Sequence, residues 1–176
     1  MTAHANSSAG ESGQRVFRVL FVCTGNTCRS PMAEGILKKI VSELPDGQIA
    51  IDVQSAGTMG LIGHPATELA VAVASQYGVD IAGHRSQDLT PELLEKSDVV
   101  LTLATEHYET CRALGKTLEV LFTLKSFPNE PHNPQRDSID DPIGGNRARY
   151  EKAFFEIDEA IRRALPTLLQ RAGITK

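Results

Sequence analysis

Two cysteines, an arginine and a serine stand close together in the stretch CTGNTCRS, residues 23–30, directly after an apolar run. Gly25 permits a positive φ and Asn26 tolerates the left-handed region, so successive backbone N–H groups can converge on one anion. Arg29 adds a planar guanidinium that matches two oxygens of a phosphate group. The stretch therefore predicts a phosphate-binding loop.

Cys23 stands at the base of this predicted loop, where its sulfur would face the phosphorus atom. The backbone N–H groups, the helix dipole, Arg29 and the Ser30 hydroxyl all favour a thiolate. We therefore expect the Cys23 pKa to fall below the usual value of about 8.5 for a free cysteine. A thiolate in a phosphate cradle is a nucleophile, so we predict in-line attack on phosphorus and a phosphocysteine intermediate that water then hydrolyses.

The leaving group of this reaction needs a proton, and the loop itself contains no acid. The best candidate is in the run DDPIGG, residues 140–145, where Pro142 restricts Asp141 to extended conformations and so holds it better than Asp140. Taken alone, this run has ordinary turn chemistry. Beside the cysteine loop, it predicts Asp141 as the general acid, with the role of Asp140 left open.

The elements that must position these residues alternate between strand and helix patterns. Arg18–Val22 is a short apolar run that predicts a strand covered on both faces. Ser30 is a natural N-cap and Pro31 suits the first turn of the following helix. Further strands are expected near 50–54, from 98 and from 118, and further helices near 66–77, from 90, near 106–114 and from 147. Residues 126–146 predict a loop of about twenty residues, and loops of that length in compact domains are usually functional or disordered. Pro166 is expected to kink or end the last helix.

This order of elements predicts one α/β domain with three layers. Its centre is a four-stranded parallel, doubly wound sheet with helices on both faces. Ligands bind at the carboxyl ends of such strands, where the loop after the first strand lies. We expect the domain to span 15–176 and the polar segment 1–14 to be a disordered tail.

The composition excludes several classes of protein. A length of 176 residues with 41% hydrophobic residues fits one domain, and a net charge of -4 argues against a nucleic-acid binder. Three cysteines suit a reduced, cytoplasmic protein, and a single C-x4-C pair is too few ligands for zinc. No run reaches the roughly 18 apolar residues of a spanning helix, and no signal peptide is recognisable. We expect no metal, no cofactor, no membrane partner and a monomer.

With these residues assigned, the sequence resembles the low-molecular-weight protein tyrosine phosphatase family, whose signature is C-x5-R-S after the first strand with a distant Asp-Pro acid. The resemblance covers about residues 15–173 and includes SAGT at 55–58 and GVDIAGHR at 78–85. It implies Cys23 as nucleophile, Arg29 as phosphate clamp and Asp141 as general acid, with phosphorylated protein as substrate. It implies a phosphate-binding set made of Thr24, Gly25, Asn26, Thr27, Cys28, Arg29 and Ser30.

Within this resemblance, Asn26 supports the loop shape and Ser30 supports the thiolate. A cysteine at position 28 is common in the family, and oxidation could join Cys28 reversibly to Cys23; this protective role is a hypothesis.

Two positions bear on the substrate. Tyrosine-specific members commonly carry aromatic residues just after Asp-Pro, where this chain has Ile143 and Gly144. Thr27 replaces the usual aliphatic residue, and the motifs resemble the bacterial protein-arginine phosphatase branch, in which this threonine is tied to phosphoarginine. That branch also usually has an aromatic residue at the position of Ile143. A guanidinium leaving group needs no stacking partner and suits a threonine hydroxyl and the acidic residues Asp137, Asp140 and Asp141. We predict phosphoarginine as substrate, with phosphotyrosine as the alternative.

Other classes of function fit fewer of these residues. An arsenate reductase would need further cysteines, and Cys111 on its predicted helix is better interpreted as a packing residue. A phosphocysteine-carrying transport module would not need Asp141, and a phosphoprotein-binding module could dispense with Cys23. His64, His84 and His107 are interpreted as caps or partly exposed polar groups, because they form no ligand pair.

Overall fold

The structure is a computed structural model that describes residues 15–45 and 50–174. The predicted tail at 1–14 lies outside the described residues. In the described parts, four parallel strands form one sheet in the order β2-β1-β3-β4. The strands are β1 (Val16–Cys23), β2 (Ala50–Gly57), β3 (Val99–Thr102) and β4 (Leu121–Thr123). Each begins within about three residues of the predicted position.

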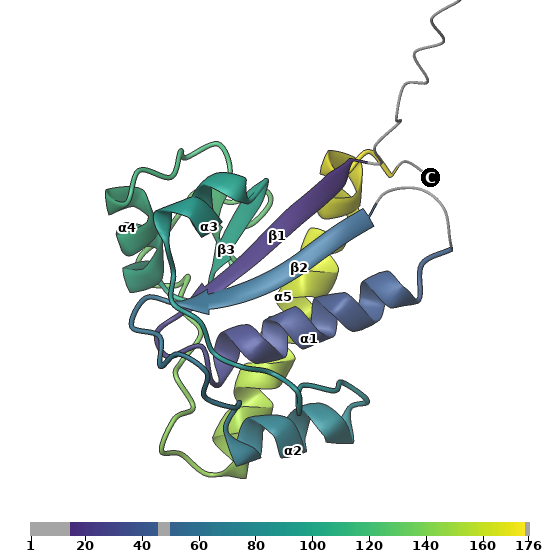
Figure 1. Cartoon of the computed structure of the whole chain (residues 1–176), viewed down its shortest axis with the longest axis vertical. Helices are drawn as coiled ribbons and strands as arrows, with labels where there is room; N and C mark the ends of the chain where they lie inside the picture. Colours follow the sequence, from purple (N-terminus) through teal and green to yellow (C-terminus); the bar gives the residue numbers. More distant parts are fainter. Residues whose placement is uncertain (1–14, 46–49, 175–176) are drawn as a thin grey trace, which may run out of the picture.

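Helices cover both faces of this sheet, as Figure 1 shows. The helices are α1 (Arg29–Ser42), α2 (Glu68–Gln76), α3 (Pro91–Lys96), α4 (Thr105–Ala113) and α5 (Arg147–Arg171). Helices α1 and α5 pack together on one face with α2 against them, while α3 and α4 lie on the other face. The predicted three-layer, doubly wound α/β fold is confirmed.

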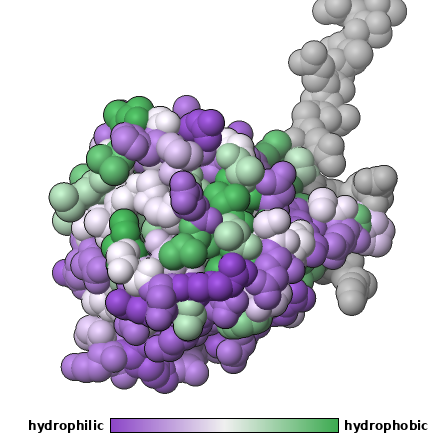
Figure 2. Space-filling model, turned by 90° about the horizontal axis from the view of Figure 1, so that it is seen from below, coloured by the Kyte–Doolittle hydropathy of each residue, from purple (hydrophilic) through white to green (hydrophobic). Residues whose placement is uncertain are grey.

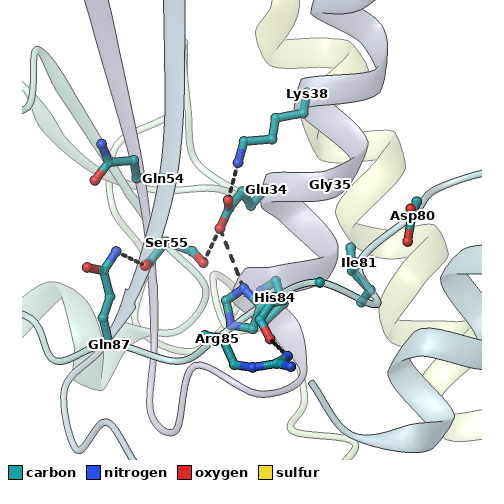
Figure 3. Close-up of a pocket in the computed structure, with 12 residues that line it drawn as sticks. Glu34, Gly35, Lys38, Gln54, Ser55, Asp80, Ile81, His84, Arg85 and Gln87 are labelled. Atoms are coloured by element: carbon teal, nitrogen blue, oxygen red, sulfur yellow. Dashed lines mark hydrogen bonds and ion pairs between the residues drawn. The ribbon is translucent and has the colours of Figure 1, made fainter. Parts of the chain in front are cut away.

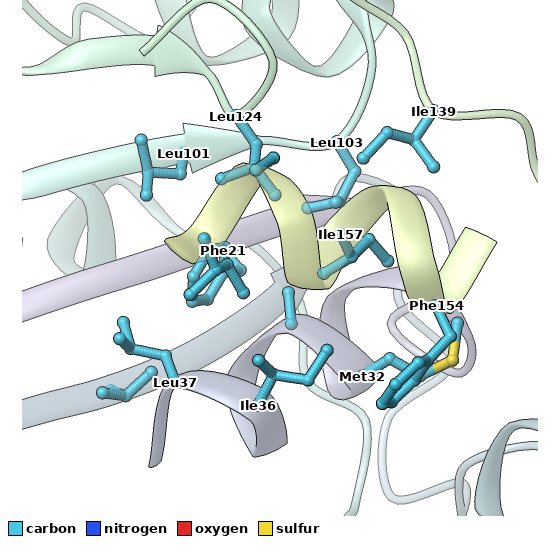
Figure 4. Close-up of a cluster of buried hydrophobic side chains, with 14 of the residues drawn as sticks. Phe21, Met32, Ile36, Leu37, Leu101, Leu103, Leu124, Ile139, Phe154 and Ile157 are labelled. Carbon is cyan, nitrogen blue, oxygen red and sulfur yellow. The ribbon is translucent and has the colours of Figure 1, made fainter. Parts of the chain in front are cut away.

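Strand β1 divides its side chains between two cores because successive residues of a strand point to opposite faces. Val19 and Phe21 face the larger core with α1 and α5, and Leu20 and Val22 face the smaller one with α3 and α4. Figure 4 shows part of the larger core, where side chains of α1, β3 and α5 meet Phe21. Full burial of each such side chain contributes about 1.5–3 kcal/mol, so the sheet that carries the cysteine loop is firmly held.

One expectation about helix ends is wrong, and of the two alternatives for Pro166 one is excluded. Ser30 is not the N-cap of α1: Cys28 occupies that position without a side-chain cap, and Ser30 lies inside the helix. Its hydroxyl bonds to neighbouring loop residues instead. Pro166 does not end α5, which continues to Arg171, because Ala164 and Leu168 on either side of it remain buried in the core.

The segment 126–146 has neither helix nor strand, as predicted, and runs from the end of the sheet to the start of α5. Its backbone is tied to the sheet where the Ile139 N–H donates to the carbonyl of Leu103 at 2.8 Å. This contact brings the following aspartates to the carboxyl ends of β1 and β3. Among the described helices, none has the length and apolar character to cross a membrane.

Candidate active site

The backbone of the cysteine loop turns sharply at Asn26, which has a φ of 53° and is the one non-glycine residue with positive φ in the described parts. The Asn26 side chain is buried and fully used. Its Nδ2 donates to Ser30 Oγ and to Ser55 Oγ, both at 2.8 Å, and its Oδ1 accepts from the Gln87 N–H at 2.9 Å. These bonds hold the left-handed turn that directs the loop N–H groups inward.

A second layer of polar residues supports Asn26 from behind, and Figure 3 shows these residues around Glu34 and Ser55. His84 Nε2 donates to the Asn26 carbonyl at 2.8 Å, and Ser55 Oγ donates to Glu34. Glu34 also binds Lys38 from the next turn of α1. These residues border a polar cavity of about 380 Å³ behind the loop. His84 is half-buried, as its interpretation as a partly exposed polar group predicts, but its contact with the loop backbone was not predicted.

Cys23 is buried at the end of β1, with its Sγ 2.8 Å from Ser30 Oγ. Because Ser30 Oγ accepts from Asn26, its own hydrogen can point to the sulfur. The expected lowering of the Cys23 pKa is not borne out. Burial raises the pKa of this thiol, and Ser30, Arg29 and the Asn26 N–H lower it only in part. The loop supports a thiolate, but the apolar core behind it opposes the charge.

Arg29 is buried and joined to the long loop. Its Nη2 lies 2.9 Å from Asp141 Oδ2, and its Nη1 donates to the Ile139 carbonyl at 2.9 Å. The other carboxylate oxygen of Asp141 accepts from the Ile143 N–H at 3.1 Å, and Arg149 donates to the Asp141 carbonyl. The guanidinium of Arg29 and the carboxylate of Asp141, 112 residues apart in the sequence, are therefore held in a fixed orientation to each other.

The predicted residues enclose a cavity of about 160 Å³. It is lined by Cys23, Thr24, Gly25, Thr27, Cys28, Arg29, Asp141 and Ile143. Asn26 and Ser30 support this lining from behind. Ile143 is 58% exposed beside it, and none of the residues that line it in the described structure is aromatic. The cavity thus unites the candidate nucleophile, clamp, acid and specificity residues.

Not every predicted acidic residue reaches this cavity. Asp137 is fully buried elsewhere in the long loop, where it bonds to the Asn133 N–H and lies 3.2 Å from His132 Nδ1. Asp140 is exposed and lies 3.5 Å from Lys152. The acidic contribution to the site is therefore Asp141, with Asp140 next to it.

Sequence reasoning also missed His107, which was interpreted as a cap or partly exposed group. It is fully buried in the first turn of α4, and its Nε2 lies 2.9 Å from Thr24 Oγ1. Burial and the positive charge of Arg29 lower the His107 pKa to about 4. The available signal was its place after β3, since the carboxyl end of that strand adjoins the loop after β1.

Cys111 packs in the smaller core with Val100 and Leu121, as its interpretation as a packing residue predicts. Burial raises its pKa to about 12, so this thiol is poorly suited to resolve an intermediate on Cys23. In the described ranges, no three His, Cys, Asp or Glu side chains are grouped to hold a metal ion.

The molecular surface shown in Figure 2 carries apolar residues in separate patches among hydrophilic ones. Exposed apolar side chains in the loop after β2 include Met59, which is 74% exposed. This loop is anchored to the site, because the Met59 N–H donates to the Thr24 carbonyl at 3.0 Å.

Comparison with known proteins places this arrangement in a family. The family model described as low molecular weight phosphotyrosine protein phosphatase matches residues 18–173. The chain is 34% identical over 145 residues to the protein-arginine-phosphatase of Bacillus subtilis, covering 82% of this chain and 91% of that protein. It is 39% identical over 127 residues to the low molecular weight protein-tyrosine-phosphatase Etp of Escherichia coli, covering 69% and 80%.

Solved structures agree with these relatives. The low molecular weight protein tyrosine phosphatase from T. tengcongensis superposes with a TM-score of 0.76 at 36% identity, covering 86% of this chain and 99% of that one. The YwlE arginine phosphatase from Geobacillus stearothermophilus gives 0.75 at 34% identity, covering 88% and 94%. The chain belongs to the low-molecular-weight phosphotyrosine protein phosphatase family. It is a protein phosphatase, and thus a hydrolase.

Proposed function

We propose that this phosphatase acts through a phosphocysteine intermediate on Cys23, with phosphoarginine in proteins as its substrate. The observation that carries the proposal is the meeting of Cys23, Arg29 and Asp141 around one small cavity. Sγ attacks phosphorus in line as the bond to the leaving group breaks, and water then attacks phosphocysteine and releases inorganic phosphate. Arg29 and the loop N–H groups stabilise the charge on the equatorial oxygens.

The Asp141 carboxylate takes up the proton that Cys23 gives up, donates it to the leaving group, and then accepts a proton from the attacking water. Its carboxylate is held by Arg29 on one oxygen and by the Ile143 N–H on the other. A bound phosphoryl group offers Arg29 a second anionic partner, so Arg29 can turn toward phosphate. When Arg29 binds the phosphate, the Asp141 oxygen that it held is free to face the leaving atom. Asp141 lines the cavity and can therefore act as the general acid.

The preference for phosphoarginine rests on the walls of the cavity. Thr27 gives the wall a hydroxyl, and Ile143 stands where a ring could stack on phosphotyrosine. A leaving guanidine is polar and forms planar hydrogen-bonded pairs with carboxylates, and Asp141 provides a carboxylate at the cavity. Phosphotyrosine is the second candidate, because relatives of similar identity include protein-tyrosine phosphatases as well as protein-arginine phosphatases.

The test is phosphate release from two peptides of the same sequence, one with phosphoarginine and one with phosphotyrosine, mixed in one reaction at neutral pH. The ratio of the two rates then gives the ratio of kcat/KM values directly. We expect the phosphoarginine peptide to be consumed first, and Thr27→Ile to shift the ratio toward phosphotyrosine. A ratio that favours phosphotyrosine in the wild type would establish the second candidate.

The mechanism is tested with three variants of the same chain. Cys23→Ser should abolish turnover while still binding substrate, and Asp141→Asn should lower the rate by about 10²–10⁴, the usual size of general acid catalysis. Cys111→Ala is the control, since it removes a sulfur that lies in the smaller core away from this cavity and should keep turnover. Full activity in Cys23→Ser would refute the covalent mechanism.

A further inference from the structure

The hydrogen bond between Thr24 and His107 is not used by the proposed mechanism, although Thr24 follows the nucleophile directly. Thr24 lines the cavity and is partly exposed to it. His107 lies behind Thr24 and is fully buried, with its Nε2 2.9 Å from Thr24 Oγ1. A buried imidazole therefore holds a hydroxyl that faces the phosphate site.

The protonation of His107 decides which way the Thr24 hydroxyl points. Burial and Arg29 keep the pKa of His107 low, at about 4, so the ring is neutral near pH 7 and carries one N–H. Its Nδ1 is buried and has no hydrogen-bond partner within residues 15–45 and 50–174. A buried N–H group without an acceptor is rarer in proteins than an acceptor with an unused lone pair. We therefore assign the hydrogen to Nε2, which donates to Thr24 Oγ1.

Thr24 Oγ1 has a second donor, because Arg29 Nη2 also points to it at 3.4 Å. A hydroxyl oxygen has two lone pairs and one hydrogen. With both lone pairs occupied by His107 and Arg29, the hydrogen has to point elsewhere, and the open side of Thr24 is the cavity. In the opposite tautomer the hydrogen is on Nδ1, and Nε2 accepts the hydrogen of the Thr24 hydroxyl. Thr24 Oγ1 then has only a lone pair to direct toward the anion.

We propose that His107 is a positioning residue that directs the hydroxyl hydrogen of Thr24 toward an oxygen of the bound phosphoryl group. The inference rests on the proposed function only in that phosphate occupies this cavity. It adds a side-chain donor to the loop N–H groups and Arg29, supplied by a residue that never touches the substrate. A hydrogen bond to a charged oxygen changes affinity by about 10- to 100-fold, so its loss is measurable.

The experiment measures phosphate binding without turnover. We expect iodoacetate to alkylate Cys23, which mass spectrometry distinguishes from Cys28, and the concentration of inorganic phosphate that halves the rate at Cys23 gives the phosphate Kd. We expect Thr24→Val to weaken this Kd by at least 10-fold and His107→Leu to weaken it by about 10-fold. His107→Gln retains an N–H that can reach Thr24 and should restore most of the affinity. Glu109→Gln is the control, because this exposed residue of α4 pairs with Arg112 and should have no effect.

A double variant separates positioning from general damage. If His107 acts through Thr24, His107→Leu should cause no further loss in the Thr24→Val background. In the wild-type background it should raise the KM and leave kcat nearly unchanged, as expected when ground-state and transition-state binding are lost equally. An unchanged Kd in His107→Leu, an equal loss in both backgrounds, or no rescue by His107→Gln would overturn the proposal.

A second measurement uses the wild-type protein alone and so does not depend on whether any variant folds. The ¹⁵N chemical shifts of the histidine ring nitrogens in the wild-type protein report which nitrogen carries the hydrogen. A hydrogen on Nε2 of His107 supports the proposal, and a hydrogen on Nδ1 overturns it. The two proposals also fail separately: a chain that binds phosphate but hydrolyses neither peptide would refute the function and leave the role of His107 intact.

Discussion

The buried His107 should make the free energy of unfolding depend on pH, and His107→Gln should remove this dependence. The His107 pKa falls from 6.5 to about 4 in the folded protein, with burial as the main cause and Arg29 as the second. Between these two values the unfolded chain binds a proton that the folded chain does not. Stability from this group is therefore fully present above about pH 6.5 and is lost as the pH falls toward 4.

The size of this effect follows from the shift. One pKa unit corresponds to about 1.4 kcal/mol, so the full difference amounts to about 3 kcal/mol, of which about 2 kcal/mol is lost by pH 5. His107→Gln has no titrating ring and should lack this term. We expect the wild type to lose about 2 kcal/mol relative to His107→Gln between pH 7.5 and pH 5.

The assay is urea unfolding of both proteins at four pH values from 7.5 to 5, followed by circular dichroism. The carboxylates titrate in both proteins, so the difference between the two curves isolates His107. Both unfolding slopes should stay equal, which shows that the same surface is exposed. Parallel curves for the two proteins would refute the reasoning, because they would mean that the ring is solvated and titrates normally in the folded state.

Three further predictions concern the loop and the core. Ser30→Ala should raise the Cys23 pKa further, because the Ser30 hydroxyl lowers it, so half-maximal alkylation by iodoacetate should move to higher pH; an unchanged profile would contradict the contact seen at 2.8 Å. Gly57→Ala places a Cβ 2.5 Å from the Thr24 carbonyl oxygen and should weaken the protection of Cys23 by phosphate. Gly83→Ala is the control, because its Cβ meets nothing within 4 Å. Equal protection in the two variants would show that the loop backbone moves to accommodate the methyl group. Ile157→Ala, in the middle of α5 and fully buried, should cost about 2–5 kcal/mol in urea unfolding, and a loss below 1 kcal/mol would mean that the core collapses around the gap.

The parts of this molecule that could be predicted from the sequence are those in which neighbouring residues carry the signal. The apolar run before Cys23 predicts β1, and the spacing of apolar residues after Arg147 predicts α5. The stretch 23–30 combines a turn, an arginine and a cysteine within eight positions, so its place at the carboxyl end of β1 follows from the fold class. The choice of Asp141 as general acid followed from chemistry, since a leaving group needs an acid, whereas its ion pair with Arg29 was not predicted.

The features that could not be predicted depend on burial or on distant contacts. Ser30 looks like an N-cap by its position before Pro31, but Cys28 is the N-cap and the helix already begins at Arg29. The Cys23 pKa is decided by the apolar core behind the sulfur, which no local pattern records. Asp137 stands in an acidic run with Asp140 and Asp141, yet its side chain turns inward and bonds within its own loop.

The loop that binds the anion is itself held by residues far along the chain. Asn26 receives its support from Ser55, His84 and Gln87, which lie 29, 58 and 61 positions away, and Thr24 receives its support from His107, 83 positions away. Ser55 lies on β2, His84 and Gln87 lie in the segment between α2 and α3, and His107 lies on α4, so every support is a hydrogen bond with a group outside the loop. Since the loop N–H groups point inward only while Asn26 keeps its left-handed turn, substitutions at these distant residues should weaken phosphate binding without touching the phosphate.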